Sequence, residues 1–496
     1  MSARWIAAAA AALLAGCASI EAPFSGHLAS AVGPVRACAG WYAWLDGQVA
    51  EAHVRDAQDA RVAGFPYLRT SRLLAALRPV AQGDARALQA LIDRMLALDE
   101  EARRHEILNL PPGRVPAATV AVERTRGCGA LLREVDMAEP EARRALLERA
   151  RVPDDYSMLD RAFGLYPLTR LAFAAGVRRQ EAETGAAFAG EPALPKDATL
   201  IRYSPPPARE AVTRAGVAAV LERSARNSLG IPEPGESELA ELLVAYAPSF
   251  DIAVRADYDR PGALRWMRDR AAPAVDAADL AVYAHAAWTR YEGRVLLQLV
   301  YTLWFPERPP QSGNDILAGT LDGLVWRVTL APDGEPLVYD TIHPCGCYHM
   351  FFPTPRARPR PAPDDTEEWM FSPQALPHLA PGERPLVRVA SGTHYVERVG
   401  VTRGADSLVR YELRPYAGLR SLQRFGPGHA SAFGEDGIIA GSERGERFLF
   451  WPMGIASAGA MRQWGRQATA FVGRRHFDDA DLLERRFILD LGAEPR

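Results

Sequence analysis

Four residues that can bind metals or carry out thiol chemistry alternate within one short stretch of this chain. His343, Cys345, Cys347 and His349 lie two positions apart in the run His-Pro-Cys-Gly-Cys-Tyr-His. Successive side chains of an extended segment point to opposite faces, so residues two apart share a face. If the run is a strand, both imidazoles and both thiols therefore line one side of it. The sequence predicts a functional site at this stretch.

A metal site is the first interpretation, because cysteine and histidine are ligands that suit zinc or copper. Alternate residues of a strand lie about 7 Å apart at Cα, so one ion can contact two or three of the four side chains. A further ligand must then come from elsewhere, and His394 and His285 are the candidates because both lie in predicted β segments. The bound ion would polarise water, as in a metal-dependent hydrolase. The run lacks the spacings of zinc fingers, haem-attachment sites and HExxH metallopeptidases.

Two other interpretations stay open. In the first, Cys345 and Cys347 form a strained, reducible disulfide, or one of them is a nucleophile with a flanking histidine as its base. In the second, the cysteines are structural and the histidines form hydrogen bonds within a sheet. The protein would then be a non-catalytic scaffold or binding module. The residue pattern alone does not decide whether the protein is an enzyme.

The remaining polar residues are predicted to have structural roles. Asp257 and Asp259 precede Arg-Pro-Gly, and Asp322 precedes a glycine, which is typical of turns. His105 falls on a charged helical segment and is predicted to be at the surface. His476 is predicted to lie in a surface loop.

The first residues predict export. Arg4 is followed by an apolar run over residues 6–14, which is too short to cross a membrane, since that takes about 20 residues. Leu14-Ala15-Gly16-Cys17 resembles the lipobox of bacterial lipoproteins. The resemblance implies cleavage before Cys17 and lipidation of Cys17, which would hold the mature protein stably on the periplasmic side of a cell-envelope membrane. Ala18 resembles the residue at this place in lipoproteins of the outer membrane. The alternative is an ordinary signal peptide, which also predicts export.

Export places the other cysteines in an oxidising compartment, where thiols tend to pair. Four cysteines remain after Cys17, and they allow three pairings. Cys38 and Cys128 both lie in helical surroundings, far along the chain from the other two. We predict a Cys38–Cys128 disulfide closing a loop of about ninety residues, which leaves Cys345 and Cys347 for chemistry or for each other.

The residue patterns change from helical to strand-like along the chain. Apolar residues recur at helical spacing in the first third, for example after the capping type Asp84. After Phe250 they alternate, with hairpin turns predicted at Glu292-Gly293 and Asp333-Gly334. We therefore predict an α+β fold, with an all-helical domain followed by a mainly antiparallel sheet with flanking helices. The predicted parts are the signal peptide (1–16), a tether (17–36), the helical domain (37–184), a linker (185–207) and the α+β domain (208–496).

Three further predictions concern segments between residues 353 and 472. Residues 353–363 are rich in proline and arginine, which favours an exposed extended loop. Residues 447–451 are predicted to form a last strand. Residues 455–472 are predicted to form a closing helix.

Composition narrows the classes of partner. The formal net charge is -3 and charged residues make up 24% of the 496-residue chain, so there is no positive excess to bind nucleic acid. The expected partners are a membrane, through the lipid on Cys17, and other envelope proteins.

Overall fold

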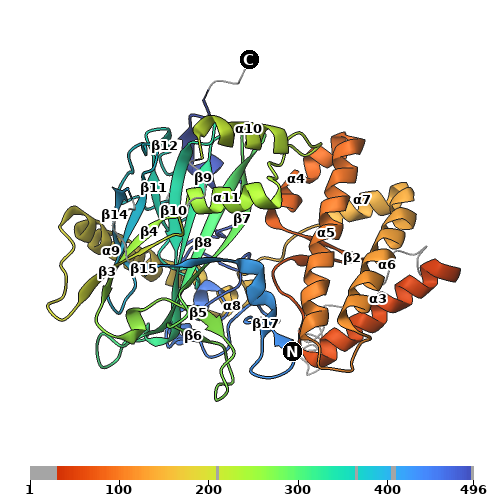
Figure 1. The fold of residues 1–496 in the computed structure, drawn as a ribbon, viewed down its shortest axis with the longest axis horizontal. Helices are drawn as coiled ribbons and strands as arrows, with labels where there is room; N and C mark the ends of the chain where they lie inside the picture. Colours follow the sequence, from red (N-terminus) through yellow and green to blue (C-terminus); the bar gives the residue numbers. More distant parts are fainter. Residues whose placement is uncertain (1–30, 208–211, 364–366, 404–408, 493–496) are drawn as a thin grey trace, which may run out of the picture.

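The computed structural model describes residues 31–207, 212–363, 367–403 and 409–492. Cys17 and the predicted signal peptide lie outside these residues. Helices dominate the first part of the chain and strands the second, which confirms the predicted α+β class. Figure 1 shows the helical part on one side of the molecule and the sheets on the other.

In the described residues, the α-helices are α3 (Gly33–Ala52), α4 (Arg72–Gly83), α5 (Ala85–Asn109), α6 (Ala118–Ala138), α7 (Pro140–Arg149), α8 (Met158–Phe163), α9 (Tyr166–Ala189), α10 (Arg214–Ser224), α11 (Glu236–Ala245), α12 (Arg447–Phe450) and α13 (Leu482–Arg486). The 3-10 helices are η1 (Asp257–Asp259), η2 (Tyr416–Ser421) and η3 (Trp451–Met453). The strands are β1 (Ala60–Val62), β2 (Phe65–Thr70), β3 (Thr199–Ser204), β4 (Ser249–Val254), β5 (Ala263–Arg265), β6 (Ala274–Asp276), β7 (Ala281–Tyr291), β8 (Arg294–Arg308), β9 (Gly319–Leu330), β10 (Pro336–Ile342), β11 (Met350–Pro353), β12 (Ala357–Pro359), β13 (Arg384–Val389), β14 (Val396–Thr402), β15 (Val409–Arg410), β16 (Glu412–Pro415), β17 (Leu422–Gln423), β18 (His429–Ala430) and β19 (Phe487–Leu489).

Helices α3 to α7 pack around one apolar core, which includes Leu45, Leu91 and Leu132. A disulfide between Cys38 of α3 and Cys128 of α6 confirms the predicted pairing. The region is not all helical, because β1 and β2 form an antiparallel hairpin within it. The side chains of Phe65 and Tyr67 in β2 are buried, and aromatic residues are favoured in strands.

Two sheets form the second part of the chain. One has the order β11-β10-β9-β8-β7-β16 and is antiparallel except where β16 joins β7. The other has the order β14-β13-β4-β3-β15, with parallel pairing between β13 and β4 and between β15 and β3. Both predicted hairpins are present, and His285 faces Val300 as the Glu292-Gly293 turn requires. Residues of both sheets share one core, which includes Trp326 and Phe352 of the first sheet and Phe250 and Val387 of the second.

Four segments differ from the sequence-based expectation. The predicted linker holds the end of α9 and strand β3, and β12 in the proline-rich segment pairs with β19. Residues 447–450 form helix α12 rather than a strand. Residues 455–472 form no helix, because Gly459 and Gly465 have positive φ angles that a right-handed helix does not accept. Apolar spacing alone did not reveal these breaks.

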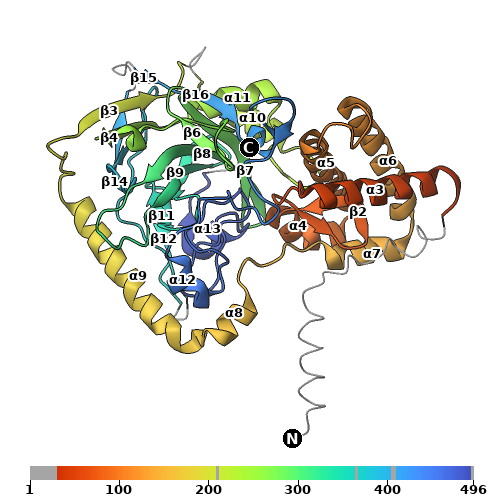
Figure 2. The ribbon, with the colours of Figure 1, turned by 90° about the horizontal axis from the view of Figure 1, so that it is seen from below.

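Helices α8 and α9 lie against the sheet half of the molecule rather than in the helical part. Figure 2 shows α9 running along the outside of the sheets, with α8 and α12 beside its first turns. The end of α8 is packed closely on η3, because a Cβ on Gly164 would lie 2.5 Å from the Cβ of Pro452. No helix in the described part of the chain is long and apolar enough to cross a membrane.

Candidate functional site

The Cys-His run is a tight turn and not a strand. It joins β10, which ends at Ile342, to β11, which begins at Met350. The backbone N–H of His343 donates to the carbonyl of Cys347 at 3.0 Å, and Gly346 N–H donates to the carbonyl of His343 at 2.8 Å. Gly346 has φ +90°, and a Cβ there would lie 2.1 Å from the carbonyl oxygen of Ala468. The prediction that the four side chains share one strand face is therefore wrong, since Pro344 and Gly346 favour a turn.

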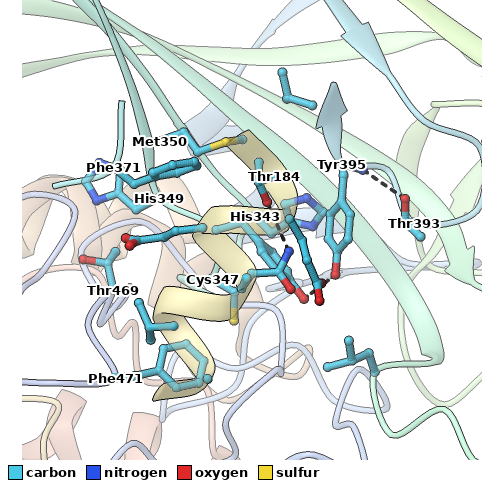
Figure 3. A pocket seen from close by; sticks show the side chains of 18 of the residues that line it. Thr184, His343, Cys347, His349, Met350, Phe371, Thr393, Tyr395, Thr469 and Phe471 are labelled. Atoms are coloured by element: carbon cyan, nitrogen blue, oxygen red, sulfur yellow. Dashed lines mark hydrogen bonds between the residues drawn. The ribbon is translucent and has the colours of Figure 1, made fainter. Parts of the chain in front are cut away.

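A cavity of about 530 Å³ lies over this turn. Helix α9 supplies one wall and crosses in front of the turn in Figure 3. Much of the lining is apolar and includes Phe173, Val177, Met350, Phe371, Phe450 and Phe471. The polar lining includes His343, Cys347, Tyr348, His349, Glu181, Glu446, Thr393, Tyr395 and Thr469. Three of the four residues of the motif therefore meet the cavity, while Cys345 lies behind it.

His343 is held by a buried carboxylate. Its Nδ1 lies 3.2 Å from Oδ1 of Asp322, and Arg444 donates to the same oxygen at 3.0 Å. Burial opposes ionisation of Asp322, but Arg444 and His343 hold its pKa well below the usual value. Burial also lowers the pKa of His343, against the attraction of Asp322. A neutral His343 donates from Nδ1 to this carboxylate, so its Nε2 is a hydrogen-bond acceptor.

His349 is likewise held by a buried carboxylate, that of Asp340. Its Nε2 lies 3.0 Å from Asp340, which also pairs with Arg327. Burial lowers the pKa of His349 to about 3, so the imidazole is neutral and donates from Nε2. Its Nδ1 is then an acceptor, and this buried atom has no hydrogen-bond partner among the described residues. The side chain of His349 is fully buried, so this atom does not reach the cavity.

His394 lies near His343 but does not reach the cavity. It stacks on Phe305 with ring centroids 4.0 Å apart, and its Nδ1 lies 2.8 Å from Asp322. Its Nε2 lies 3.4 Å from Asp259. Burial disfavours charge, but the carboxylates of Asp259 and Asp322 raise the pKa of His394 above its ordinary value. The two carboxylates thus favour the protonated form of His394.

Cys345 and Cys347 are free thiols that lie close to each other. The backbone N–H of Cys347 lies 3.4 Å from Sγ of Cys345. Hydrogen bonding with Cys345 and burial raise the pKa of Cys347 well above the usual value. The described residues contain no hydrogen bond between a histidine and either sulfur. The thiol of Cys347 is therefore protonated at neutral pH, and no histidine among the described residues contacts it.

Two carboxyl groups of the cavity wall have raised pKa values. Burial raises the pKa of Glu446 to about 7, against the opposing effect of Arg444. Burial and the charge of Glu368 raise the pKa of Glu181, on α9, to about 7. Neither side chain has an ion-pair partner in the part of the chain that the structure describes. Near neutral pH both can exchange a proton with a ligand.

The structure does not gather the six predicted metal ligands around one point. His285 lies on β7 between Tyr416 and Trp464, away from the cavity, and burial lowers its pKa to about 3. Within the described ranges, no three His, Cys, Asp or Glu side chains form a group that could hold a metal ion. Zinc or copper binding stays a prediction.

Three residues predicted to be ordinary surface or turn positions are buried. His105 is 1% exposed and its Nδ1 lies 2.7 Å from Ser421, while His476 is 5% exposed and lies 3.2 Å from Asp155. Asp259 accepts hydrogen bonds from Ser391 and Gly392. Each is covered by a segment that is distant along the chain, so local sequence patterns could not reveal it.

Sequence reasoning also missed residues of the site itself. Asp322 was expected in a turn, but it is a fully buried residue of β9. Tyr348 and Tyr395, whose hydroxyls bond each other, and Glu446 gave no local signal at all. No known protein family matches this chain, and neither a curated protein nor a solved structure is similar to it.

Proposed function

We propose that this protein is a lipid-anchored binding protein of the bacterial cell envelope, and that its ligand is a small, largely apolar molecule held beneath α9. The observation that carries the proposal is the cavity of about 530 Å³ with its many aromatic and aliphatic side chains. Ligand sites are typically concave and mostly apolar, with a few polar groups that fix orientation. The cell-envelope location rests on the resemblance of residues 14–17 to a lipobox.

The polar groups of the cavity indicate what else the ligand carries. Nε2 of His343 is a hydrogen-bond acceptor at the cavity wall, which favours a ligand with an N–H or O–H donor. Glu446 and Glu181 would accept a proton or pair with a cationic group above about pH 7. The proposed ligand is therefore an apolar molecule with a donor or amine at one end.

Binding is favoured over thiol catalysis by the state of the cysteines. A thiolate is the nucleophile in acyl transfer and in disulfide exchange, and the raised pKa of Cys347 disfavours it. His343 could serve as a base only if its Nε2 contacted the thiol, and the described residues contain no hydrogen bond between His343 and either sulfur. Cys347 thus contributes an apolar wall to the cavity, as buried free cysteines commonly do.

The proposal is tested with a neutral apolar fluorophore, N-phenylnaphthylamine, titrated into full-length protein carrying Cys17→Ser. We expect saturable binding of about one probe per chain. Gly176→Trp places a large side chain in the cavity wall on α9 and should abolish this binding. Ala175→Trp is the matched control, because Ala175 is exposed on the same helix and does not line the cavity.

The outcomes separate the alternatives. Equal loss of binding in both tryptophan variants would mean that the probe sits on the surface, and the proposal would fail. Mass spectrometry of a solvent extract of the purified protein provides an independent check. A single co-purified amphiphile that is absent from Gly176→Trp would identify the ligand class.

A further inference from the structure

A concentrated patch of exposed apolar side chains lies on the outer side of α8, α9 and α12. Six of them define what we call the apolar face: Phe163, Leu165, Leu168, Leu171, Phe448 and Leu449, which are 58% to 74% exposed. Single exposed apolar residues are ordinary, but contiguous groups mark interaction sites. These six come from two short segments that the fold brings together.

Packing of the three helices places the residues of the apolar face on neighbouring elements. Phe173 of α9 meets Phe450 of α12, with ring centroids 6.0 Å apart. The backbone N–H of Ser157, just before α8, donates to the carbonyl of Gly454 at 2.7 Å, just after η3. Figure 2 shows α8, α12 and the start of α9 side by side on the same side of the molecule. A single flat partner could therefore cover all three.

The charges around the apolar face are mainly positive. Residues 158–179 contain four arginines and one carboxylate, Asp160, although Arg161 is buried and Arg179 pairs with Glu183. Arg170, Arg178 and Arg447 have no ion-pair partner among the described residues, and Arg447 lies over the ring of Phe448. Apolar side chains bordered by arginines are the combination that inserts into the interface of an anionic bilayer. The chain as a whole is slightly acidic, so this local excess is a property of the patch.

We infer that the apolar face docks on a lipid bilayer containing anionic phospholipid, as a contact separate from the lipid predicted on Cys17. Phe163, Leu168 and Phe448 enter the acyl boundary while the arginines contact headgroup phosphates. Such a contact would set the orientation of the protein on the membrane and place α9, one wall of the cavity, at the bilayer surface. The inference does not require the cavity to be occupied.

The test uses full-length protein with Cys17→Ser, so that any binding is independent of lipidation. Flotation is measured with vesicles of phosphatidylcholine alone and of phosphatidylcholine mixed with phosphatidylglycerol. We expect binding to the mixed vesicles that weakens with added salt. Leu168→Glu and Phe448→Glu should each weaken it by at least about tenfold. Phe425→Glu is the matched control, because Phe425 is 62% exposed on a different surface.

A second pair of variants tests the charges. Arg170→Gln with Arg178→Gln should reduce binding to the mixed vesicles and make it less sensitive to salt. Absence of vesicle binding by Cys17→Ser protein would overturn the inference, as would equal losses with Phe425→Glu. A concentration-dependent dimer broken by Phe448→Glu, without vesicle binding, would assign the apolar face to a second copy of the chain. Probe binding in the cavity is measured without vesicles, so the proposed function can fail or hold independently of this result.

Discussion

His343 and His394 are joined through a single carboxylate. Oδ1 of Asp322 lies 3.2 Å from Nδ1 of His343, and Oδ2 lies 2.8 Å from Nδ1 of His394. One of these histidines lines the cavity and the other does not, so Asp322 connects the wall of the cavity to a second, fully buried histidine. The two histidines are thus linked through hydrogen bonds to one carboxylate.

Replacing Asp322 should destabilise the protein strongly. Asp322→Asn leaves Arg444 buried without its negative partner, which typically costs about 3–5 kcal/mol of unfolding free energy. Urea denaturation measures the loss. Asp257→Asn is the control, because that side chain is 97% exposed and should change stability by less than about 0.5 kcal/mol. Equal effects of the two substitutions would contradict the role assigned to Asp322.

The same carboxylate should make the protein sensitive to acid. Its folded-state pKa is lowered mainly by Arg444 and His343, against the effect of burial. The stabilisation is therefore complete above the unfolded value of about 3.9 and is lost as pH falls toward the lower folded value. Below about pH 4, wild type should lose stability more steeply than Asp322→Asn. Parallel acid unfolding curves would contradict this.

Glu446 should have the opposite pH dependence. Because burial raises its pKa to about 7, the folded protein keeps a proton that the unfolded chain releases above the ordinary glutamate value. Its contribution to stability is thus present at acid pH and is lost as pH rises to about 7. Glu446→Gln should raise the melting temperature more at about pH 8 than at about pH 5. The exposed Glu443→Gln serves as control and should show no such difference.

The Cys38–Cys128 disulfide should stabilise the helical part of the chain. It joins residues 90 positions apart, and losing such a crosslink typically costs about 2–5 kcal/mol. Cys38→Ala combined with Cys128→Ala should lower the urea midpoint by a corresponding amount. A reducing agent should destabilise the wild type but leave the double variant unchanged. A reductant effect of equal size on both proteins would assign it elsewhere.

The thiols of the turn should be slow to react in the folded protein. The pKa of Cys347 is raised by its hydrogen bond with Cys345 and by burial, so little thiolate is present at neutral pH. Alkylation by iodoacetamide, followed by mass spectrometry, should be slow in native protein and rapid after unfolding. Rapid labelling of one cysteine in native protein would instead support thiol chemistry.

Elemental analysis of the same sample tests the predicted metal site. If His343, Cys347 and a further ligand hold zinc or copper, the protein purifies with about one equivalent of metal. Cys347→Ser should then lose it, while Cys38→Ala combined with Cys128→Ala should keep it. Protein purified without chelator and free of metal would contradict the prediction.

Local patterns in the amino-acid sequence were enough to predict several features. Helical and alternating periodicities predicted the α+β class, and the Glu292-Gly293 turn predicted that His285 faces Val300. The separation of Cys38 and Cys128 from the other cysteines predicted the disulfide. The sequence also singled out the run from His343 to His349, and three of its residues line the cavity.

Only the tertiary structure decided how those side chains are used. Gly346 fits against the backbone of Ala468, a contact between segments more than a hundred residues apart, and this turns the run away from a strand. Asp322 and Glu446 reach the site from other elements, and α9 covers it from a segment expected to belong to the helical domain. Burial and pairing of charges arise from such long-range contacts, and periodicity along the chain carries no information about them.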